Sequence, residues 1–202
     1  MPLSFLNTLD DHSSGTIDAG SINTLTGAAA DLNTAYDSAG ITGLNDEAIT
    51  LSDTTLAASV LNTLDGHTSG TVNASTVTTL TGAAADLITA YASGGISNLG
   101  DEAVSVSSGT ASTSQANTLA AATTGVVTAT LSDGGLTTLA GLTETGNAYS
   151  ITITDTSVDA AALNTLNGKT TVAIDAANIS TLTGAAADLN TAYDSAGITG
   201  LN

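Results

Sequence analysis

Short stretches in which apolar and polar residues alternate recur along the chain. In the stretch at 48–52, Ile49 and Leu51 alternate with Thr and Ser, which is the period-two pattern of a strand with one buried face. The first apolar positions of the seven stretches are Ile17, Ile49, Val72, Val104, Val127, Ile151 and Ile174. The pattern therefore predicts seven short strands, starting near residues 16, 48, 71, 103, 126, 150 and 173.

Between these strands, apolar residues recur at helical spacing. Asp53 follows the strand at 48–52, and aspartate commonly accepts hydrogen bonds from the first N–H groups of a helix. Leu56, then Val60 or Leu61, and then Leu64 form an apolar stripe that ends at a glycine turn. Because an isolated helix of about ten residues is marginal in water, this stripe must pack against the sheet and against neighbouring helices.

The spacing of the strands indicates a repeat. The interval between successive apolar positions of this series is either short or long. In chain order the intervals are long, short, long, short, short and short. The basic repeat therefore has about 23 residues, and two repeats carry about nine more. In the longer repeats a second helical run, such as AAADLITAY at 83–91, follows Val77 and Leu80. The phrase TLTGAAADLNTAYDSAGITGLN occurs at 24–45 and returns unchanged at 181–202.

Repeats of this length are typical of solenoids, in which each repeat packs only on its neighbours. The expected fold is α/β, a solenoid of about seven β–α repeats of roughly 23–32 residues, with one parallel sheet and the helices on one side. Each repeat is long enough for the crossover that parallel strands need. We expect residues 1–202 to be a single solenoid domain, cut from a longer array. The alternative is an all-β parallel solenoid, in which the LNTL and ANTL stretches are strands.

The composition narrows the classes of function. One basic residue, Lys169, stands against 19 Asp and Glu, for a formal net charge of -18. Nucleic-acid binding needs clustered Lys and Arg, so this charge excludes nucleic acid as a partner. The chain has no cysteine and no long apolar run, so we expect neither disulfides nor membrane insertion. The segment at 1–6 is too short and uncharged to be a secretory signal.

Two acidic pairs are weak candidates for a metal site. Asp46 with Glu47, and Asp101 with Glu102, occupy equivalent positions of two repeats, in loops that contain glycine. Calcium takes oxygen ligands from carboxylates, amides and backbone carbonyls, which makes these loops candidate sites for weak Ca²⁺ binding. The chain contains no DxDxDG loop and no GGxGxDxUx nonapeptide. We therefore expect no cofactor, with Ca²⁺ as the alternative.

No other residues form a recognisable catalytic or ligand site. His12 and His67 share one position in the repeat, and Ala122 and Lys169 stand there in later repeats, which is typical of a solvated turn. A half-buried packing role is favoured over sugar binding for the aligned tyrosines Tyr36, Tyr91 and Tyr193. The chain has no nucleophile elbow, no paired acid and base and no phosphate loop, so an enzyme is not expected.

The outward strand positions form a polar row that consists of Asp18, Thr50, Asn73, Ser105, Thr128, Thr152 and Asp175. Ice-binding solenoids present regular rows of threonine, which aspartate interrupts here. The second inward positions alternate between small and large side chains, in the order Ala19, Leu51, Ala74, Val106, Ala129, Ile153 and Ala176. Since a packed core has a fixed volume, we expect Val77, Leu80, Ile22 and Leu25 to fill the space beside the alanines.

The stretch DEAITLSDTTLAASVLNTLDGHTSGTVNASTVTTLTGAAADL at 46–87 resembles the degenerate repeats of very large secreted surface proteins of aquatic bacteria, labelled β-strand-repeat or adhesin-like proteins. The resemblance covers essentially the whole chain. It implies an extracellular or cell-surface location and a structural or adhesive role, and it carries over no functional residues. Some of those proteins have calcium-binding nonapeptides, which this chain lacks.

These observations predict a non-catalytic structural or adhesive repeat segment of an extracellular surface protein. The alternative is a module that binds Ca²⁺ or a glycan, and a water-ordering surface is the third choice. The expected partners are neighbouring repeats of the same array. Both ends of the chain share a phase with interior repeats, so head-to-tail self-association is also expected.

Overall fold

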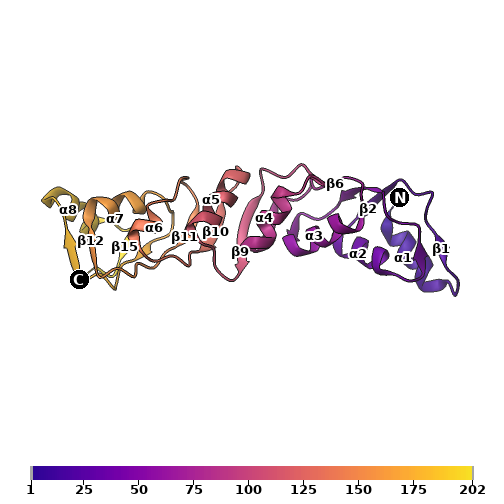
Figure 1. Cartoon of the computed structure of the whole chain (residues 1–202), viewed down its shortest axis with the longest axis horizontal. Coiled ribbons are helices and arrows are strands. Elements are labelled where there is room, and N and C mark those ends of the chain that lie inside the picture. Colours follow the sequence, from indigo (N-terminus) through magenta and orange to yellow (C-terminus); the bar gives the residue numbers. More distant parts are fainter. Residues whose placement is uncertain (1, 202) are drawn as a thin grey trace. The chain divides into compact units, whose positions relative to one another are not determined.

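The computed structural model describes residues 2–201, whose contacts divide the chain into two compact units, Met1–Glu102 and Ala103–Asn202. Both units are mixed α/β, and every strand pair described in them is parallel (Figure 1). Within residues 2–201 there are eight helices, four in each unit. The α/β class expected from the sequence is confirmed.

The first unit alternates short strands with helices. Its helices are α1 (Leu3–His12), α2 (Ala29–Asp37), α3 (Ala58–His67) and α4 (Ala84–Ala92). Its strands are β1 (Ile17–Asp18), β2 (Thr24–Gly27), β3 (Ile41–Thr42), β4 (Ala48–Leu51), β5 (Thr55–Ala57), β6 (Val72–Asn73), β7 (Thr79–Ala83) and β8 (Ile96–Ser97). Helices α2, α3 and α4 thus each lie between one strand that precedes the helix and one that follows it.

Strands β2, β4, β6 and β8 form one parallel sheet in that order. Leu25 lies opposite Ile49, Ile49 opposite Val72, and Val72 opposite Ile96, so each residue is paired with one a full repeat further along the chain. Strand β1 pairs with β3, and β5 with β7, at the same separation. One repeat of the structure is therefore a helix with its flanking strands.

The second unit follows the same plan with more variation. Its helices are α5 (Thr113–Ala122), α6 (Leu136–Leu139), α7 (Ala160–Asn167) and α8 (Ala186–Asp194). Its strands are β9 (Ala103–Ser108), β10 (Val127–Thr130), β11 (Ala148–Ser150), β12 (Ser157–Asp159), β13 (Ile174–Asp175), β14 (Thr181–Thr183) and β15 (Ile198–Thr199). Strand β10 pairs with β9 and β11, β12 pairs with β14, and β13 pairs with β15.

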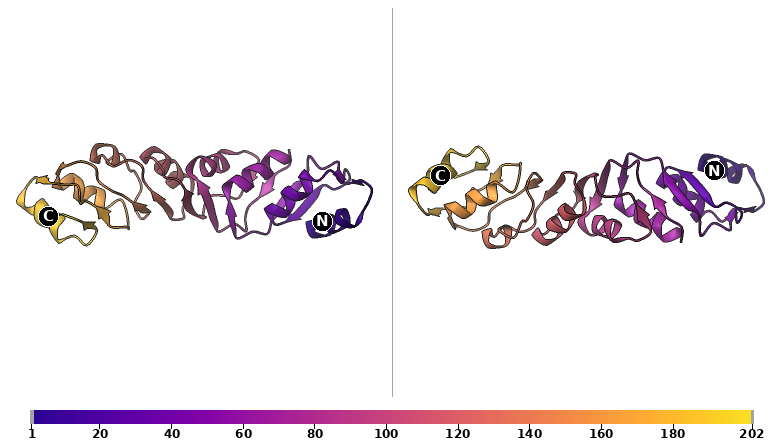
Figure 2. Two further views of the ribbon diagram at one scale, coloured as in Figure 1. Left: turned by 90° about the horizontal axis from the view of Figure 1, so that it is seen from below. Right: turned by 90° about the horizontal axis from the view of Figure 1, so that it is seen from above.

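Consecutive helices of the first unit pack side by side, and Figure 2 shows the helices following one another along the ribbon. A common pattern is burial of the first, fourth and seventh residues of the helix, which in α3 are Ala58, Leu61 and Leu64. Positions three apart lie on one helix face, so the Ala-x-x-Leu-x-x-Leu spacing gives a narrow apolar stripe. The small first residue lets the start of the helix lie close to its neighbours.

Most of the strand predictions are confirmed. The strands that contain or adjoin the seven apolar positions start at residues 17, 48, 72, 103, 127, 148 and 174, close to the expected starts. The second inward positions, where small and large side chains alternate, are all buried. Val77, Leu80 and Leu25 are buried beside them as expected, and Ile22 is half-buried. The LNTL and ANTL stretches lie in helices, so the all-β alternative is wrong.

The expected second helical run is confirmed to within one residue, as helix α4 at Ala84–Ala92. The apolar positions before it are not helical, because Thr79–Ala83 is strand β7. Gly82 has φ of +146°, a conformation that glycine tolerates and a helix does not. The glycine-rich stretch after α4 contains strand β8 at Ile96–Ser97. Because of these additional strands, the structure has several parallel sheets rather than the one sheet expected.

The additional residues of the longer repeats also have a structural meaning. In the first unit the helices begin at Leu3, Ala29, Ala58 and Ala84. The interval between the starts of α2 and α3 is therefore longer than the intervals before and after it. The sequence repeats that start at Ile17, Ile49 and Val72 each contain one helix, which is α2, α3 and α4 in turn. The longer interval holds an additional strand, β4, which pairs with β2 on one side and β6 on the other.

Tyr149, in β11, is among the largest fully buried side chains of the core. Its hydroxyl donates to the carbonyl of Ala116 in α5 at 3.4 Å. Burial, together with the nearby charge of Glu144, raises the pKa of Tyr149 to about 12, so the phenol stays protonated at neutral pH. The hydrogen bond joins strand β11 to helix α5.

We predict that Leu64→Ala lowers the free energy of unfolding by about 2–5 kcal/mol, because it removes a fully buried side chain and leaves a cavity. Leu9, its equivalent in the N-terminal repeat, is 45% exposed and is the matched control, so Leu9→Ala should lower the free energy by under about 1 kcal/mol. Urea denaturation of both variants measures the difference. Equal losses would contradict the assignment of Leu64 to the core.

Candidate functional site

The two glutamates of the acidic pairs are buried rather than exposed in their loops. The Glu47 carboxylate accepts hydrogen bonds from the Tyr36 hydroxyl at 2.7 Å and from the Asn45 N–H at 3.2 Å. Glu102, at the equivalent position, accepts from the Tyr91 hydroxyl at 2.9 Å and from the backbone N–H of Gly100. A cation at either carboxylate would have to displace these donors.

The Tyr36 hydroxyl stays protonated and donates to the Glu47 carboxylate. Burial and the neighbouring Glu47 raise the pKa of Tyr36 well above its usual value. Tyr36 and Tyr91 are half-buried, which agrees with the packing role expected from the sequence. Since a buried carboxylate without donors is strongly unfavourable, each Tyr–Glu pair anchors its loop to the helix that precedes it.

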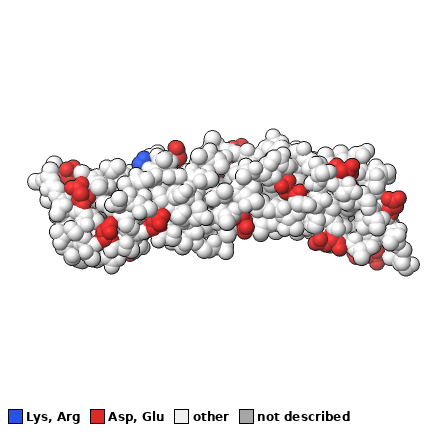
Figure 3. All heavy atoms as spheres, in the orientation of Figure 1, with Lys and Arg blue, Asp and Glu red and all other residues white. Residues whose placement is uncertain are grey.

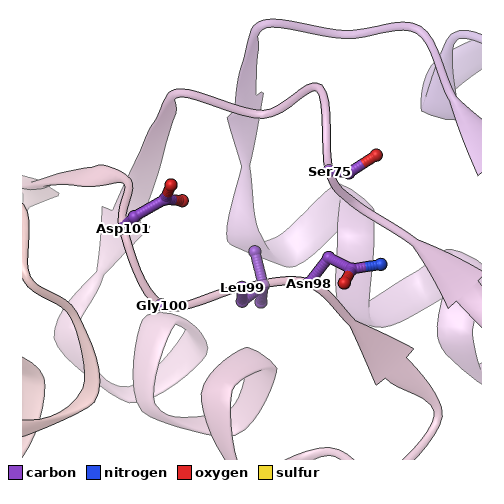
Figure 4. Close-up of a pocket in the computed structure, with 5 residues that line it drawn as sticks. All are labelled: Ser75, Asn98, Leu99, Gly100 and Asp101. Atoms are coloured by element: carbon purple, nitrogen blue, oxygen red, sulfur yellow. The ribbon is translucent and has the colours of Figure 1, made fainter.

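The two aspartates of the acidic pairs are exposed. Asp101 lines a shallow depression together with Ser75, Asn98, Leu99 and Gly100 (Figure 4). The Asn98 amide donates to the Asn73 side-chain oxygen at 2.9 Å, and Asn98 has φ of +62°. The depression therefore brings one carboxylate near polar groups that are partly engaged with each other.

The four candidate metal ligands stay in two separate loops. Asp46 and Glu47 lie in the first loop, and Asp101 and Glu102 lie in the second, each beside its own Tyr–Glu pair. Within each loop the glutamate is buried and the aspartate is exposed. The two carboxylates of a pair therefore occupy different environments.

Acidic side chains are dispersed over the surface. Figure 3 shows them singly or in small groups separated by uncharged surface. Within residues 2–201, no three His, Cys, Asp or Glu side chains gather as a metal-binding group. The one lysine of the sequence, Lys169, donates to the carbonyl of Thr143 at 2.9 Å. On the face that Figure 3 shows, the negative charge is therefore dispersed.

The two histidines differ in environment, although they occupy equivalent positions. His12 is exposed, with Nδ1 2.8 Å from the Thr8 carbonyl. The His67 ring stacks on Tyr36 with centroids 5.2 Å apart, and its Nε2 lies 3.5 Å from an Asp37 oxygen, too far for a strong hydrogen bond. The expectation of a solvated turn is therefore wrong for His67, which is the last residue of α3 and contacts α2.

Two aspartates that follow strands cap a helix. The helix that each one caps is the preceding helix and not the following one. Asp53 accepts from the N–H of Ala29 at 2.8 Å, and Asp155 accepts from the N–H of Leu136 at 2.7 Å. Each of these two aspartates lies in the repeat that follows the helix it caps. For Asp53, the expected capping role is right and the expected partner helix is wrong. The N-cap residue Ala28 makes no side-chain capping bond, so α2 depends on the next repeat.

A second contact joins the fifth residue of one helix to the next repeat. In five helices of residues 2–201 this residue is an asparagine whose side-chain amide donates to a backbone carbonyl of the following repeat at 2.8–3.2 Å. The five asparagines are Asn7, Asn33, Asn62, Asn117 and Asn164. Four of the five acceptors are carbonyls in the first turn of the next helix. The LNT triplets of the sequence are the signal that identifies most of these residues.

A third contact joins the last turn of one helix to the turn that follows the next helix. Ser93 donates to Asp65 at 2.6 Å and accepts from the N–H of Gly95 at 3.0 Å. A Cβ on Gly95 would overlap the Asp65 carboxylate, so only glycine fits there. Ser38 makes the same contacts with Asp10 and with Gly40, which accounts for the Ser-x-Gly pattern after these helices.

Hydroxyl groups on the strands make a fourth contact. Each of five strand hydroxyls donates to a strand carbonyl of the preceding repeat, and they belong to Thr42, Thr81, Ser97, Thr183 and Thr199. These hydroxyls join repeats and are not free donors at the surface. The outward row differs from the one expected, since Asp18 lies opposite Thr42 rather than Thr50.

We predict that Asn62→Asp lowers the free energy of unfolding by about 1–3 kcal/mol, because it replaces the amide donor to the Asp86 carbonyl with a carboxylate oxygen. The matched control is Asn190, the exposed residue at the same position of α8. Asn190→Asp should change stability by under about 0.5 kcal/mol. Denaturant titration measures both variants, and equal effects would contradict the role of Asn62 between repeats.

We predict an acid-dependent contribution from Asp133, whose pKa is lowered below 3.8 by the hydrogen bond from the Thr113 N–H. A carboxyl whose pKa is lowered on folding stabilises the fold above its unfolded value, and this stabilisation disappears as pH falls through the lowered value. Asp133→Asn should therefore be less stable than the wild type at neutral pH, with the gap closing below pH 3.8. Urea denaturation at several pH values tests this, with the exposed Asp11→Asn as control. A gap independent of pH would contradict it.

None of the helices within residues 2–201 is long and apolar enough to cross a lipid bilayer. No family model, curated protein or solved structure matches this chain.

Proposed function

We propose that this chain is a non-catalytic structural or adhesive segment of an extracellular surface protein, built as a β–α solenoid. Its partners in this proposal are further repeats of the same kind, within one chain or in head-to-tail contact with another copy. The location and the adhesive role come from the resemblance to repeats of secreted surface proteins. The structural role has support of its own in the contacts between repeats.

The observation that carries the proposal is the use made of the polar side chains. Asn62, Ser93 and Asp53 each bind the backbone or a side chain of a neighbouring repeat. The groups that most resemble a chemical site, the Tyr36–Glu47 and Tyr91–Glu102 pairs, bind each other. A segment whose polar groups hold its repeats together is suited to spacing and display rather than to turnover of a substrate.

The competing proposal is a module that binds Ca²⁺ or a glycan. The exposed Asp101 beside Ser75 and Asn98 is the best place for a cation, and Tyr193, 54% exposed, is the most accessible of the aligned aromatic rings.

A water-ordering surface is the third candidate. The outward row Thr26, Thr50, Asn73 and Ser97 of the first unit contains only two threonines, which makes a regular threonine lattice a poor match.

We predict that millimolar Ca²⁺ leaves the melting temperature unchanged relative to Mg²⁺ at equal ionic strength. A ligand that binds the folded state alone raises stability with its concentration, so a rise specific to Ca²⁺ would favour the binding module. Asp101→Asn is the matched variant, because it removes the carboxylate of the depression and leaves the buried Glu102 in place. A rise that Asp101→Asn abolishes would locate the cation there.

The location is tested on the native organism. Antibodies raised against this chain should label intact, unpermeabilised cells or the culture medium, and external protease should remove the cell-bound signal. Labelling that requires permeabilisation, with an epitope resistant to external protease, would overturn the surface location. The structural contacts described above would stand in either case.

A further inference from the structure

One ring nitrogen of His67 is buried between two helices of the first unit. Within residues 2–201 this nitrogen, Nε2, has no hydrogen-bond partner, although buried polar atoms in proteins rarely lack one. The Oδ1 atom of Asp37 lies 3.5 Å from it. The His67 side chain is 26% exposed and the Asp37 side chain 69%, so an ion from the solvent can reach the pair.

The distance between Nε2 of His67 and Oδ1 of Asp37 matches that between two ligands of a tetrahedral metal ion. Zinc binds imidazole nitrogen at about 2.0–2.1 Å and carboxylate oxygen at about 2.0–2.2 Å, and its geometry is usually tetrahedral. Two such ligands are about 3.4 Å apart. Ligands at right angles would be only about 2.9 Å apart at the same bond lengths. The observed 3.5 Å therefore fits a tetrahedral ion.

The chemical types of the two side chains also favour zinc. Imidazole nitrogen suits zinc, copper and nickel, whereas calcium and magnesium take oxygen ligands. Copper and nickel favour square-planar or tetragonal arrangements, in which neighbouring ligands lie at right angles. The net charge of -18 also raises the local concentration of cations at the surface. Zn²⁺ is therefore the ion that this pair fits best.

Neighbouring side chains hold the imidazole in position. The His67 ring stacks on Tyr36, with centroids 5.2 Å apart and planes 1° apart. The Tyr36 hydroxyl donates in turn to the buried Glu47 carboxylate at 2.7 Å. Asp37 follows Tyr36 as the last residue of α2, and His67 is the last residue of α3. Since the ring is already oriented, less ordering is required when a metal binds.

The Tyr–Glu contact does not require the histidine or the aspartate. Tyr91 of α4 donates to a buried glutamate in the same way, yet Ala92 stands at the position of Asp37. In α5, Ala122 stands at the position of His67. The chain therefore keeps this loop anchor where both candidate ligands are absent. Anchoring of the loop thus does not account for the presence of His67 and Asp37.

We propose that His67 Nε2 and Asp37 Oδ1 bind one Zn²⁺ ion, with water at the remaining positions. The ion joins the last residue of α2 to the last residue of α3. Structural and catalytic zinc sites usually have three or four protein ligands, so a site with two is weaker and reinforces a fold that forms without it. The proposal goes beyond the proposed function, because neither the surface location nor the contacts between repeats require the ion.

Isothermal titration calorimetry with ZnCl₂ tests the proposal, on the chain purified without a polyhistidine tag and in excess MgCl₂. Magnesium competes at sites made of carboxylates alone and binds imidazole poorly. The wild type should bind one Zn²⁺, and His67→Gln and Asp37→Asn should each weaken binding about tenfold or more. His12→Gln is the matched control, because His12 is exposed and contacts a backbone carbonyl. It should bind Zn²⁺ like the wild type.

Thermal melting gives a second measurement of the same site. A ligand that binds only the folded state raises the melting temperature, so Zn²⁺ should stabilise the wild type and His12→Gln. It should leave the melting temperatures of His67→Gln and Asp37→Asn unchanged. Melts in EDTA check that the variants are folded. Because the Asp37 side chain is largely exposed, Asp37→Asn should melt like the wild type under that condition.

Absence of Zn²⁺ binding in excess MgCl₂ overturns the proposal, as does binding that His67→Gln leaves unchanged. Binding that His67→Gln removes and Asp37→Asn leaves intact would indicate a lone imidazole, which also overturns the pair. An equal loss in His12→Gln would contradict the assignment to His67. None of these outcomes bears on surface labelling or on the response of Asp101 to Ca²⁺, so failure of the zinc site is distinguishable from failure of the proposed function.

Discussion

Parallel pairing of strands one repeat apart is the constraint on which the other features depend. Because paired strands run in the same direction, the chain must return between them, and a short helix commonly makes the return. The register places Leu25, Ile49, Val72 and Ile96 in one inward-facing row. A shift of one residue would turn that row toward solvent. Paired residues of the first unit are 23 or 24 positions apart along the chain, and this separation limits the combined length of the helix and turns between them.

The low content of charged residues follows from the same constraint. Every repeat in the middle of a unit has two neighbours, so many of its polar side chains lie at a contact with restricted access to water. Neutral amides and hydroxyls are buried there at a smaller free-energy cost than charged groups. Carboxylates occur at such contacts where donors meet them, as at Asp53, which accepts from the N–H of Ala29, and at Glu47. Threonine, serine and asparagine can therefore replace the lysines and glutamates of an ordinary surface.

Local patterns predicted the elements of the fold better than the contacts between them. The strand at Ile49 is evident because alternation is a local property. Strand β7 was missed because Val77, Leu80, Ala84 and Leu87 also fit helical spacing, and Gly82 was the better signal. Sequence position cannot show that Asp53 caps the preceding helix, since that partner is a whole repeat away. The burial of Glu47 was hidden because the residue stands beside Asp46 in a polar loop.

The capping of one helix by an aspartate of the next repeat gives the chain a direction. Helix α2 receives the acceptor for its first N–H only when Asp53 is in place. During synthesis, therefore, each such helix is completed one repeat behind the emerging chain. Unfolding that proceeds from the C-terminal side would remove acceptors from helices still folded, whereas unfolding from the N-terminal side would remove helices whose acceptors remain. In an array of such repeats, loss of a repeat on one side would therefore weaken its neighbour, whereas loss on the other side would leave the caps of its neighbour intact.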